Sequence, residues 1–128
     1  MWKWIQAFAS PKIFYHTSAK IIPWLMYPFI GLTLLGLYWA LIASPADYQQ
    51  GDSVRIMYVH VPAAWMSLFI YIVMAVAGAI GLIWQIKLAN VVATVSAPIG
   101  AIFTFLALVT GAVWGKPMWG TWWVWDAR

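Results

Sequence analysis

The sequence contains no cysteine and very little charge. Without cysteine, the chain can form no disulfide and can offer no thiolate to zinc or to an iron–sulfur cluster. Only 8% of its residues are charged, whereas an average soluble domain has about 25%. Because such a chain has too few polar side chains to cover a surface in water, we predict an integral membrane protein.

The scarcity of charge and of reactive groups also excludes some functions. The net charge is only +4 and the cations are scattered, so we expect no nucleic-acid partner. The sequence offers no carboxylate pair and no serine beside a histidine with an orienting acid. We therefore expect a protein that is not an enzyme.

Apolar residues, in contrast, are abundant. They make up 65% of the chain, and the mean hydropathy is +0.84. Three long stretches lack formal charge, and each exceeds the roughly 20 residues that a helix needs to cross a bilayer. The predicted transmembrane helices are residues 22–42, 61–84 and 91–113. We thus predict an all-α integral membrane protein in which residues 1–128 form a single membrane domain.

The positive charges suggest an orientation. Lysines precede the first apolar stretch, which places the N-terminus in the cytoplasm by the positive-inside rule. Residues 1–20 mix aromatic residues with lysine and are predicted to be an amphipathic segment on the inner membrane surface. Residues 44–60 and 114–128 are then loops on the outer, periplasmic face. A signal peptide is a competing interpretation of the first stretch, but its apolar region exceeds the usual length of about 7–15 residues.

Small and hydroxyl residues recur at helical spacing in the second and third predicted helices. The two sets are His60, Ala64, Ser67, Tyr71, Met74, Gly78, Gly81 and Gln85, and Ser96, Gly100, Thr104, Ala107 and Gly111. Such residues let membrane helices approach closely, so they predict a packing seam. The short turn at 87–90 makes these helices antiparallel neighbours. A permeation path along the seam is the alternative, although no aspartate, glutamate, lysine or arginine lines it.

The tryptophans fall into two groups. Six are spread near predicted helix ends, as in an aromatic belt at the lipid–water boundary: Trp2, Trp4, Trp24, Trp39, Trp65 and Trp84. The other five crowd one outer segment: Trp114, Trp119, Trp122, Trp123 and Trp125. Gly115, Pro117 and Gly120 argue against a long regular helix there; an extended segment would direct Trp123 and Trp125 to one side and Trp122 to the other. Either a helical or an extended chain provides a broad aromatic surface, suited to a large planar ligand.

His60 lies on the same predicted face as these tryptophans. A histidine near a helix end is commonly only an interfacial residue, but neutral imidazole is also a frequent ligand of haem iron. Arg55 and Arg128 could pair with the ligand's carboxylates, and Asp126 could orient an arginine or an indole N–H. These residues leave three uses open: a haem-like ligand, a surface for a partner protein or membrane lipid, and simple anchoring.

The stretches PADYQQGDSVRIMYVHVPAAW and GKPMWGTWWVWDAR closely resemble the haem exporter protein C family of the bacterial cytochrome c maturation (Ccm) system, with its tryptophan-rich WWD motif. The resemblance implies a multi-pass protein of the bacterial inner membrane that binds b-type haem transiently at the periplasmic face. It implies that the histidine matching His60 is an axial ligand of the iron.

The resemblance also implies partners. Members deliver haem to a periplasmic haem chaperone, and they act with ATP-binding-cassette transporter subunits and a small single-helix membrane subunit. The family has further transmembrane helices and a second axial histidine, so we expect this chain to be an N-terminal portion of such a protein. The alternative function is a membrane scaffold or transport subunit that docks partner proteins through the tryptophan-rich segment.

Overall fold

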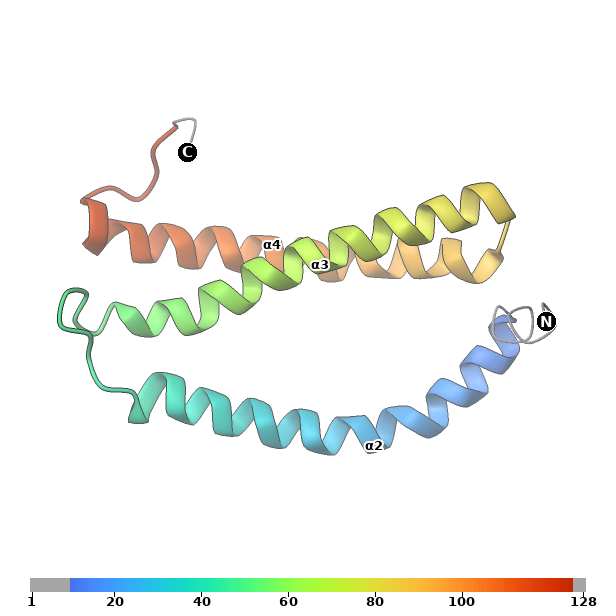
Figure 1. Ribbon diagram of the computed structural model, residues 1–128, viewed down its shortest axis with the longest axis horizontal. Helices are drawn as coiled ribbons and strands as arrows, with labels where there is room; N and C mark the ends of the chain where they lie inside the picture. The colour runs from blue at the N-terminus through green and yellow to red at the C-terminus, as the bar shows by residue number, and fades with distance from the viewer. Residues whose placement is uncertain (1–9, 126–128) are drawn as a thin grey trace.

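A computed structural model describes residues 10–125, and this part of the chain is helical apart from its connections. The elements are α2 (Pro11–Tyr38), the π-helical turn η1 (Trp39–Ala43) that continues it, α3 (Val54–Trp84) and α4 (Lys87–Trp119) (Figure 1). Three helical segments, Pro11–Ala43, Val54–Trp84 and Lys87–Trp119, are long and apolar enough to cross a membrane. The predicted all-α membrane architecture is therefore confirmed.

The helices are longer than the predicted spans. Residues 54–60 were predicted to belong to a loop but form the first turns of α3, and residues 114–119 form the last turns of α4. Residues 11–20 run without a break into the rest of α2. The prediction followed hydropathy, whereas a helix continues beyond the apolar stretch as long as its backbone amides find partners. Residues 1–9 lie outside the described residues, so the interfacial role of 1–20 stays a prediction.

Two proline positions follow from these longer helices. Pro62 was expected in a first helical turn but lies well inside α3, where it cannot donate a hydrogen bond to the carbonyl of Tyr58. Pro117 lies inside α4, which passes through Gly115 as well and ends at Trp119, with Gly120 as its C-cap. Gly120 adopts a φ of +77°, and its N–H donates to the Lys116 carbonyl at 3.0 Å. Of the three residues expected to prevent a long helix here, Gly115 and Pro117 lie within α4, and Gly120 ends it with a left-handed backbone.

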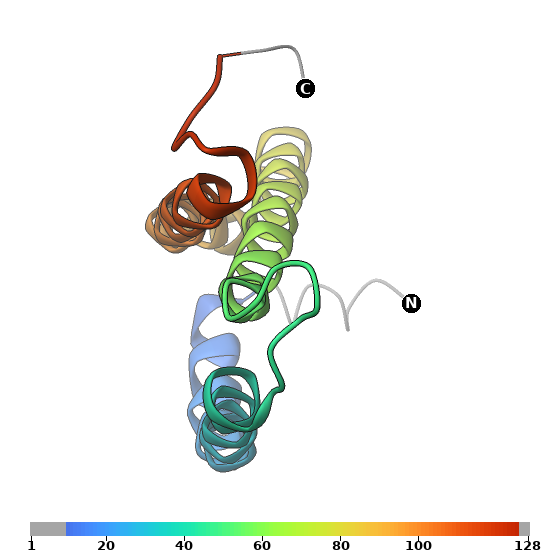
Figure 2. The same cartoon turned by 90° about the vertical axis from the view of Figure 1, so that its left-hand side faces the viewer.

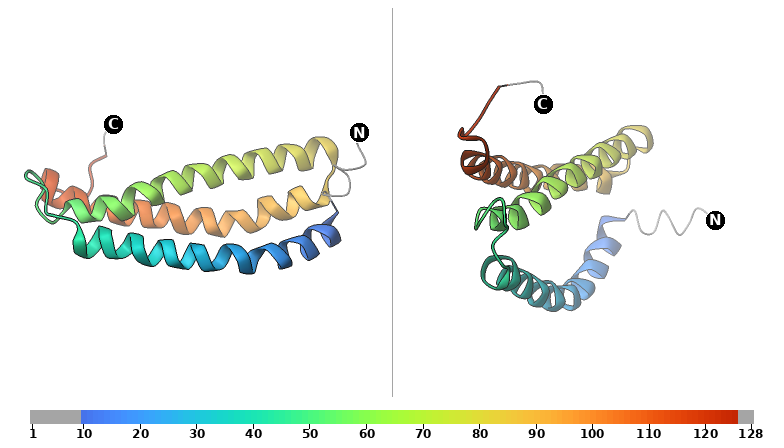
Figure 3. Two further views of the ribbon diagram at one scale, coloured as in Figure 1. Left: turned by 60° about the horizontal axis from the view of Figure 1, so that its bottom comes forward. Right: turned by 60° about the vertical axis from the view of Figure 1, so that its left-hand side comes forward.

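Helices α3 and α4 are antiparallel neighbours, as predicted, and cross along their length (Figure 3). The buried side chains of α3 recur every seven residues, at Ala63, Ile70 and Ala77. A Cβ added at Gly100 of α4 would lie 3.1 Å from Cγ2 of Ile70, so this glycine allows the close approach. Tyr71, which the predicted stripe included, is 72% exposed. The seam is thus rotated from the hydroxyl-bearing face toward the alanine and isoleucine face.

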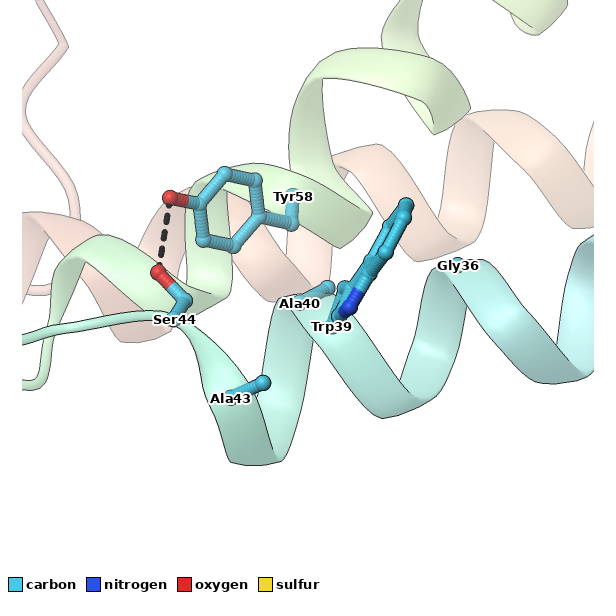
Figure 4. A pocket seen from close by; sticks show the side chains of 6 residues that line it. All are labelled: Gly36, Trp39, Ala40, Ala43, Ser44 and Tyr58. Carbon is cyan, nitrogen blue, oxygen red and sulfur yellow. Dashed lines mark hydrogen bonds between the residues drawn. The ribbon is translucent and has the colours of Figure 1, made fainter.

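The first helix touches α3 mainly through its last turn, η1, among the described residues. The ribbon of α2 curves along its length (Figures 1 and 3), and it contains Pro23 and Pro28. Where η1 meets α3, a cleft of about 460 Å³ lies beside Gly36 and Ala40. Figure 4 shows the Tyr58 hydroxyl pointing at Ser44, with a hydrogen bond of 2.9 Å between them.

Arg55 fastens the connection between these two helices. Its guanidinium donates to the carbonyl oxygens of Leu41 and of Ser44, the latter at 3.0 Å, and its Nε lies 3.2 Å from Oδ1 of Asp52. Carbonyls at the end of a helix have no partner within it, so a cation is favoured there. Arg55 therefore holds the end of η1 against the start of α3.

The loop 44–53 and the segment 120–125 lie at the same end of the molecule, on the left of Figure 1 and facing the viewer in Figure 2. The start of α2 and the α3–α4 turn lie at the opposite end. At the loop end, α3 lies between α4 and the first helix in both views. The two predicted outer loops thus share one end, and its assignment to the periplasm stays a prediction.

Candidate functional site

A cavity of about 760 Å³ opens at this loop end, between α3, α4 and the segment that follows α4. Its lining residues are His60, Gly111, Ala112, Trp114, Gly115, Trp119, Thr121, Trp122, Trp123, Val124 and Trp125. Ligand pockets commonly measure about 300–1,000 Å³ and are mostly apolar with a few polar groups. Within the lining, His60 is the residue whose side chain is a common metal ligand. We call this cavity the tryptophan pocket.

The His60 ring is held by α4. Its Nδ1 lies 3.0 Å from the Ala107 carbonyl oxygen and 3.1 Å from the Thr110 hydroxyl. A carbonyl oxygen can only accept, so we assign the proton to Nδ1. Nε2 then carries the lone pair, and it makes no hydrogen bond to residues 10–125. This is the arrangement of a metal-binding histidine, whose second nitrogen usually donates to a carbonyl or carboxylate.

Gly111 gives the ring its place. A Cβ at this position would lie 3.0 Å from Cε1 and 3.5 Å from Nδ1 of His60. The absence of a side chain lets the imidazole lie against the backbone of α4, within reach of the carbonyl one turn earlier. The short polar contacts of His60 thus depend on a glycine.

The pocket walls are aromatic. Trp114 and Trp119, both on α4, meet edge to face with ring centroids 4.9 Å apart, and Trp123 and Trp125 do so at 5.7 Å. Edge-to-face pairs add roughly 0.5–1.5 kcal/mol beyond the area that they bury. Residues 121–125 are not helical, which agrees with the extended alternative, where Trp123 and Trp125 lie on one side.

The loop 44–53 reaches this wall. Trp114 Nε1 donates to Gln50 Oε1 at 3.1 Å, and the backbone N–H of Gln50 donates to Oδ1 of Asp47 at 2.8 Å. Asp47 and Gly51 exchange two backbone hydrogen bonds, at 2.9 and 3.1 Å, with Gly51 at φ +57°. The tight turn therefore places the amide that orients Trp114.

The structure brings together some of the predicted site residues and not others. His60 and all five outer tryptophans line the pocket. Arg55 does not, because its guanidinium is held at the end of η1. Asp126 and Arg128 lie outside the described residues. In residues 10–125, no group of three His, Cys, Asp or Glu side chains is close enough to hold a metal ion, so His60 is the candidate donor.

Sequence reasoning missed the residues that support the ring. Thr110 and the carbonyl of Ala107 hold Nδ1, and Thr121 and Val124 complete the lining. Ala107 and Gly111 did belong to the predicted helix stripe. Their spacing of four, opposite His60, was the signal that could have identified them.

The amino-acid sequence of this chain is similar to that of a known protein family. A statistical model of the family described as "Heme exporter protein C" matches residues 4–128. The chain belongs to the heme exporter protein C family. The family membership predicted from the WWD-like segment is thereby confirmed.

Two curated relatives match the whole chain, and a third matches about three quarters of it. The "Heme exporter protein C" of Haemophilus influenzae is 55% identical over 130 residues, which include 100% of this chain and 52% of that protein. That of Escherichia coli strain K12 is 56% identical over 128 residues, again 100% of this chain and 52% of the relative. A "Putative cytochrome c biosynthesis ccmC-like mitochondrial protein" of Marchantia polymorpha is 54% identical over 97 residues, 76% of this chain and 42% of the relative. The chain thus spans about half the length of these relatives.

Proposed function

We propose that this chain binds haem in the tryptophan pocket, with His60 as an axial ligand of the iron, as part of haem delivery for cytochrome c maturation. The observation that carries the proposal is the His60 ring itself. Its Nδ1 donates to the Ala107 carbonyl, and the ring lines a pocket that five tryptophans also line. With the proton on Nδ1, the lone pair is on Nε2, the nitrogen that would bind the iron.

The pocket suits a porphyrin in size and character. Its volume of about 760 Å³ falls within the range of pockets for ligands of this size. Its flat, apolar walls match the faces of a porphyrin, and tryptophan rings stack on such faces. The haem would be b-type and transiently held. It would be bound by non-covalent contacts and one histidine, so it could dissociate, whereas a covalently attached haem could not.

The family and the apolar helices support a proposal for the location of the protein. We propose a multi-pass protein of the bacterial inner membrane, with the N-terminus in the cytoplasm and the pocket at the periplasmic face. There it would pass haem to a periplasmic haem chaperone, alongside ATP-binding-cassette subunits and a small single-helix subunit. The names of the relatives, which call them heme exporters, support this proposal.

The experiment compares the two histidines of the chain. Purified protein in detergent is titrated with haem, and the Soret band and Kd are recorded for wild type, His60→Ala and His16→Ala. His16 lies on exposed α2 away from the pocket, so His16→Ala controls for the loss of an imidazole. We expect a shifted Soret band and weaker binding for His60→Ala alone. An unchanged Soret band and Kd for that variant would remove His60 from the iron.

A docking surface for a partner protein is the second candidate. It is favoured by the exposure of the rings, since Trp125 is 92% and Trp119 is 69% exposed. Replacing Trp122 and Trp123 by alanine would then abolish capture of a purified haem chaperone while the Soret band stays unaltered. Transport through the α3–α4 seam has no such support, because the Ser67 and Thr104 hydroxyls bond to carbonyls of their own helices.

A further inference from the structure

We infer that Lys116 recognises the carboxylates of the ligand in the tryptophan pocket and so makes the pocket selective for an anionic porphyrin. This rests on the proposed function, which it deepens by naming a specificity-determining residue. Sequence reasoning had assigned that role to Arg55 and Arg128.

The first observation is where Lys116 lies. Its Nζ stands 5.9 Å from the centroid of the Trp122 ring, and Trp122 lines the pocket. That distance is at the limit of a cation–π contact, which holds an ammonium beside an aromatic wall. The ammonium is thus positioned next to the tryptophan wall while its side chain stays exposed to solvent.

The second observation is that the other described cations are elsewhere. Arg55 is engaged with the carbonyls of Leu41 and Ser44. Lys12 lies in the first turn of α2, and Lys87 begins α4; both helix starts are at the end opposite the pocket (Figure 1). Lys20 lies three turns into α2, a helix that does not line the pocket. In residues 10–125, Lys116 is therefore the cation beside the tryptophan pocket.

The third observation concerns unused donors. An ammonium has three N–H groups, and Lys116 uses one of them in a hydrogen bond of 2.9 Å to the Gly120 carbonyl. That bond anchors Nζ over the turn that starts the tryptophan segment. Two donors remain for an incoming carboxylate, and a charge-assisted hydrogen bond of this kind is stronger than a neutral one. If the carboxylates of the ligand lie at the opening of the pocket, they can accept hydrogen bonds from these two N–H groups.

The experiment removes the charge from each partner in turn. Wild type, Lys116→Gln and Lys116→Arg are titrated with haem and with haem dimethyl ester, whose carboxylates are methylated. Lys87→Gln, at the other end of α4, is the matched control for loss of a lysine. All four proteins are measured in the same nonionic detergent at low and high salt, since screening weakens an exposed ion pair.

We expect Lys116→Gln to weaken haem binding by roughly 3- to 10-fold, as a partly exposed charge-assisted contact would. Binding of the dimethyl ester should not change, Lys116→Arg should retain the preference for haem, and high salt should reduce that preference in the wild type. Equal weakening for both porphyrins would overturn the inference and reduce Lys116 to a support of Trp122. No change for either would also overturn it.

The proposed function is judged separately by the His60→Ala variant with the same two porphyrins. If His60→Ala loses the Soret shift with both while Lys116→Gln does not discriminate between them, the haem site stands and the carboxylate role of Lys116 fails. If the wild type binds neither porphyrin, the haem site fails and the carboxylate role fails with it.

Discussion

Adding one methyl group at Gly111 should weaken haem binding by displacing His60. In Gly111→Ala the new Cβ would stand 3.0 Å from Cε1 of the ring, whereas carbon atoms rest at about 3.5–4.0 Å. The ring must therefore move away from α4 by roughly 0.5 Å. The hydrogen bond from Nδ1 to the Ala107 carbonyl, now 3.0 Å, would then lengthen beyond the usual limit of about 3.2 Å.

The size of the effect follows from that bond. A lost hydrogen bond costs roughly 0.5–1.5 kcal/mol, which corresponds to about a 2- to 13-fold rise in the Kd for haem. The outer partner of a metal-binding histidine can matter more, up to about 10- to 100-fold. We therefore expect a rise of about 5-fold or more, together with a changed Soret band, because the ring loses the contact that orients it.

The assay is a haem titration in detergent with the thermal unfolding midpoint measured in parallel. Gly78→Ala is the matched control, since a Cβ there meets nothing within 4 Å and the change only favours the helix. It should leave the Kd unchanged. An unaltered Kd and Soret band for Gly111→Ala would refute the view that the backbone of α4 orients the iron ligand.

Two further predictions concern the loop 44–53. Gln50→Ala removes the acceptor of Trp114 Nε1, so we expect haem affinity to fall roughly 2- to 5-fold and the tryptophan emission to shift. Gln50→Glu keeps an acceptor and should retain wild-type affinity and emission. Equal losses in the two variants would contradict the role of Gln50 as the acceptor. Arg55→Ala frees the carbonyls at the end of η1, so we expect the free energy of unfolding to fall by about 1–3 kcal/mol and residues 44–53 to be cut faster by protease. Because Arg55 lies away from the pocket, haem affinity should change little. A large loss of haem affinity with unchanged stability would show instead that Arg55 contacts the ligand.

Much of the site was predictable because the two ends of the helices can be assigned from the sequence. His60 and the tryptophans of 114–125 lie at the same end of the three antiparallel helices. Counting the transmembrane spans in the sequence is enough to predict that they lie close together. The helix boundaries were less predictable. Val54 begins α3 because the turn at Asp47 and the Arg55 contacts shape the loop there, and hydropathy does not register either one.

The amino-acid sequence alone determined the class of protein. The chain is 65% apolar and has three long uncharged stretches, and a continuous stretch of that length makes all its backbone hydrogen bonds within lipid by forming a helix. The sequence also determined that an aromatic surface would form, since four tryptophans lie within seven residues. Only the tertiary structure decided which charges serve that surface. Arg55 and Lys116 both lie near the loop end of their helices, yet Arg55 is held by the end of η1 and Lys116 stands beside the Trp122 ring. The physical reason is that ion pairs and hydrogen bonds act over a few ångströms. The sequence predicts at which end of a helix a residue lies, but only the packing of the side chains determines contacts at that distance.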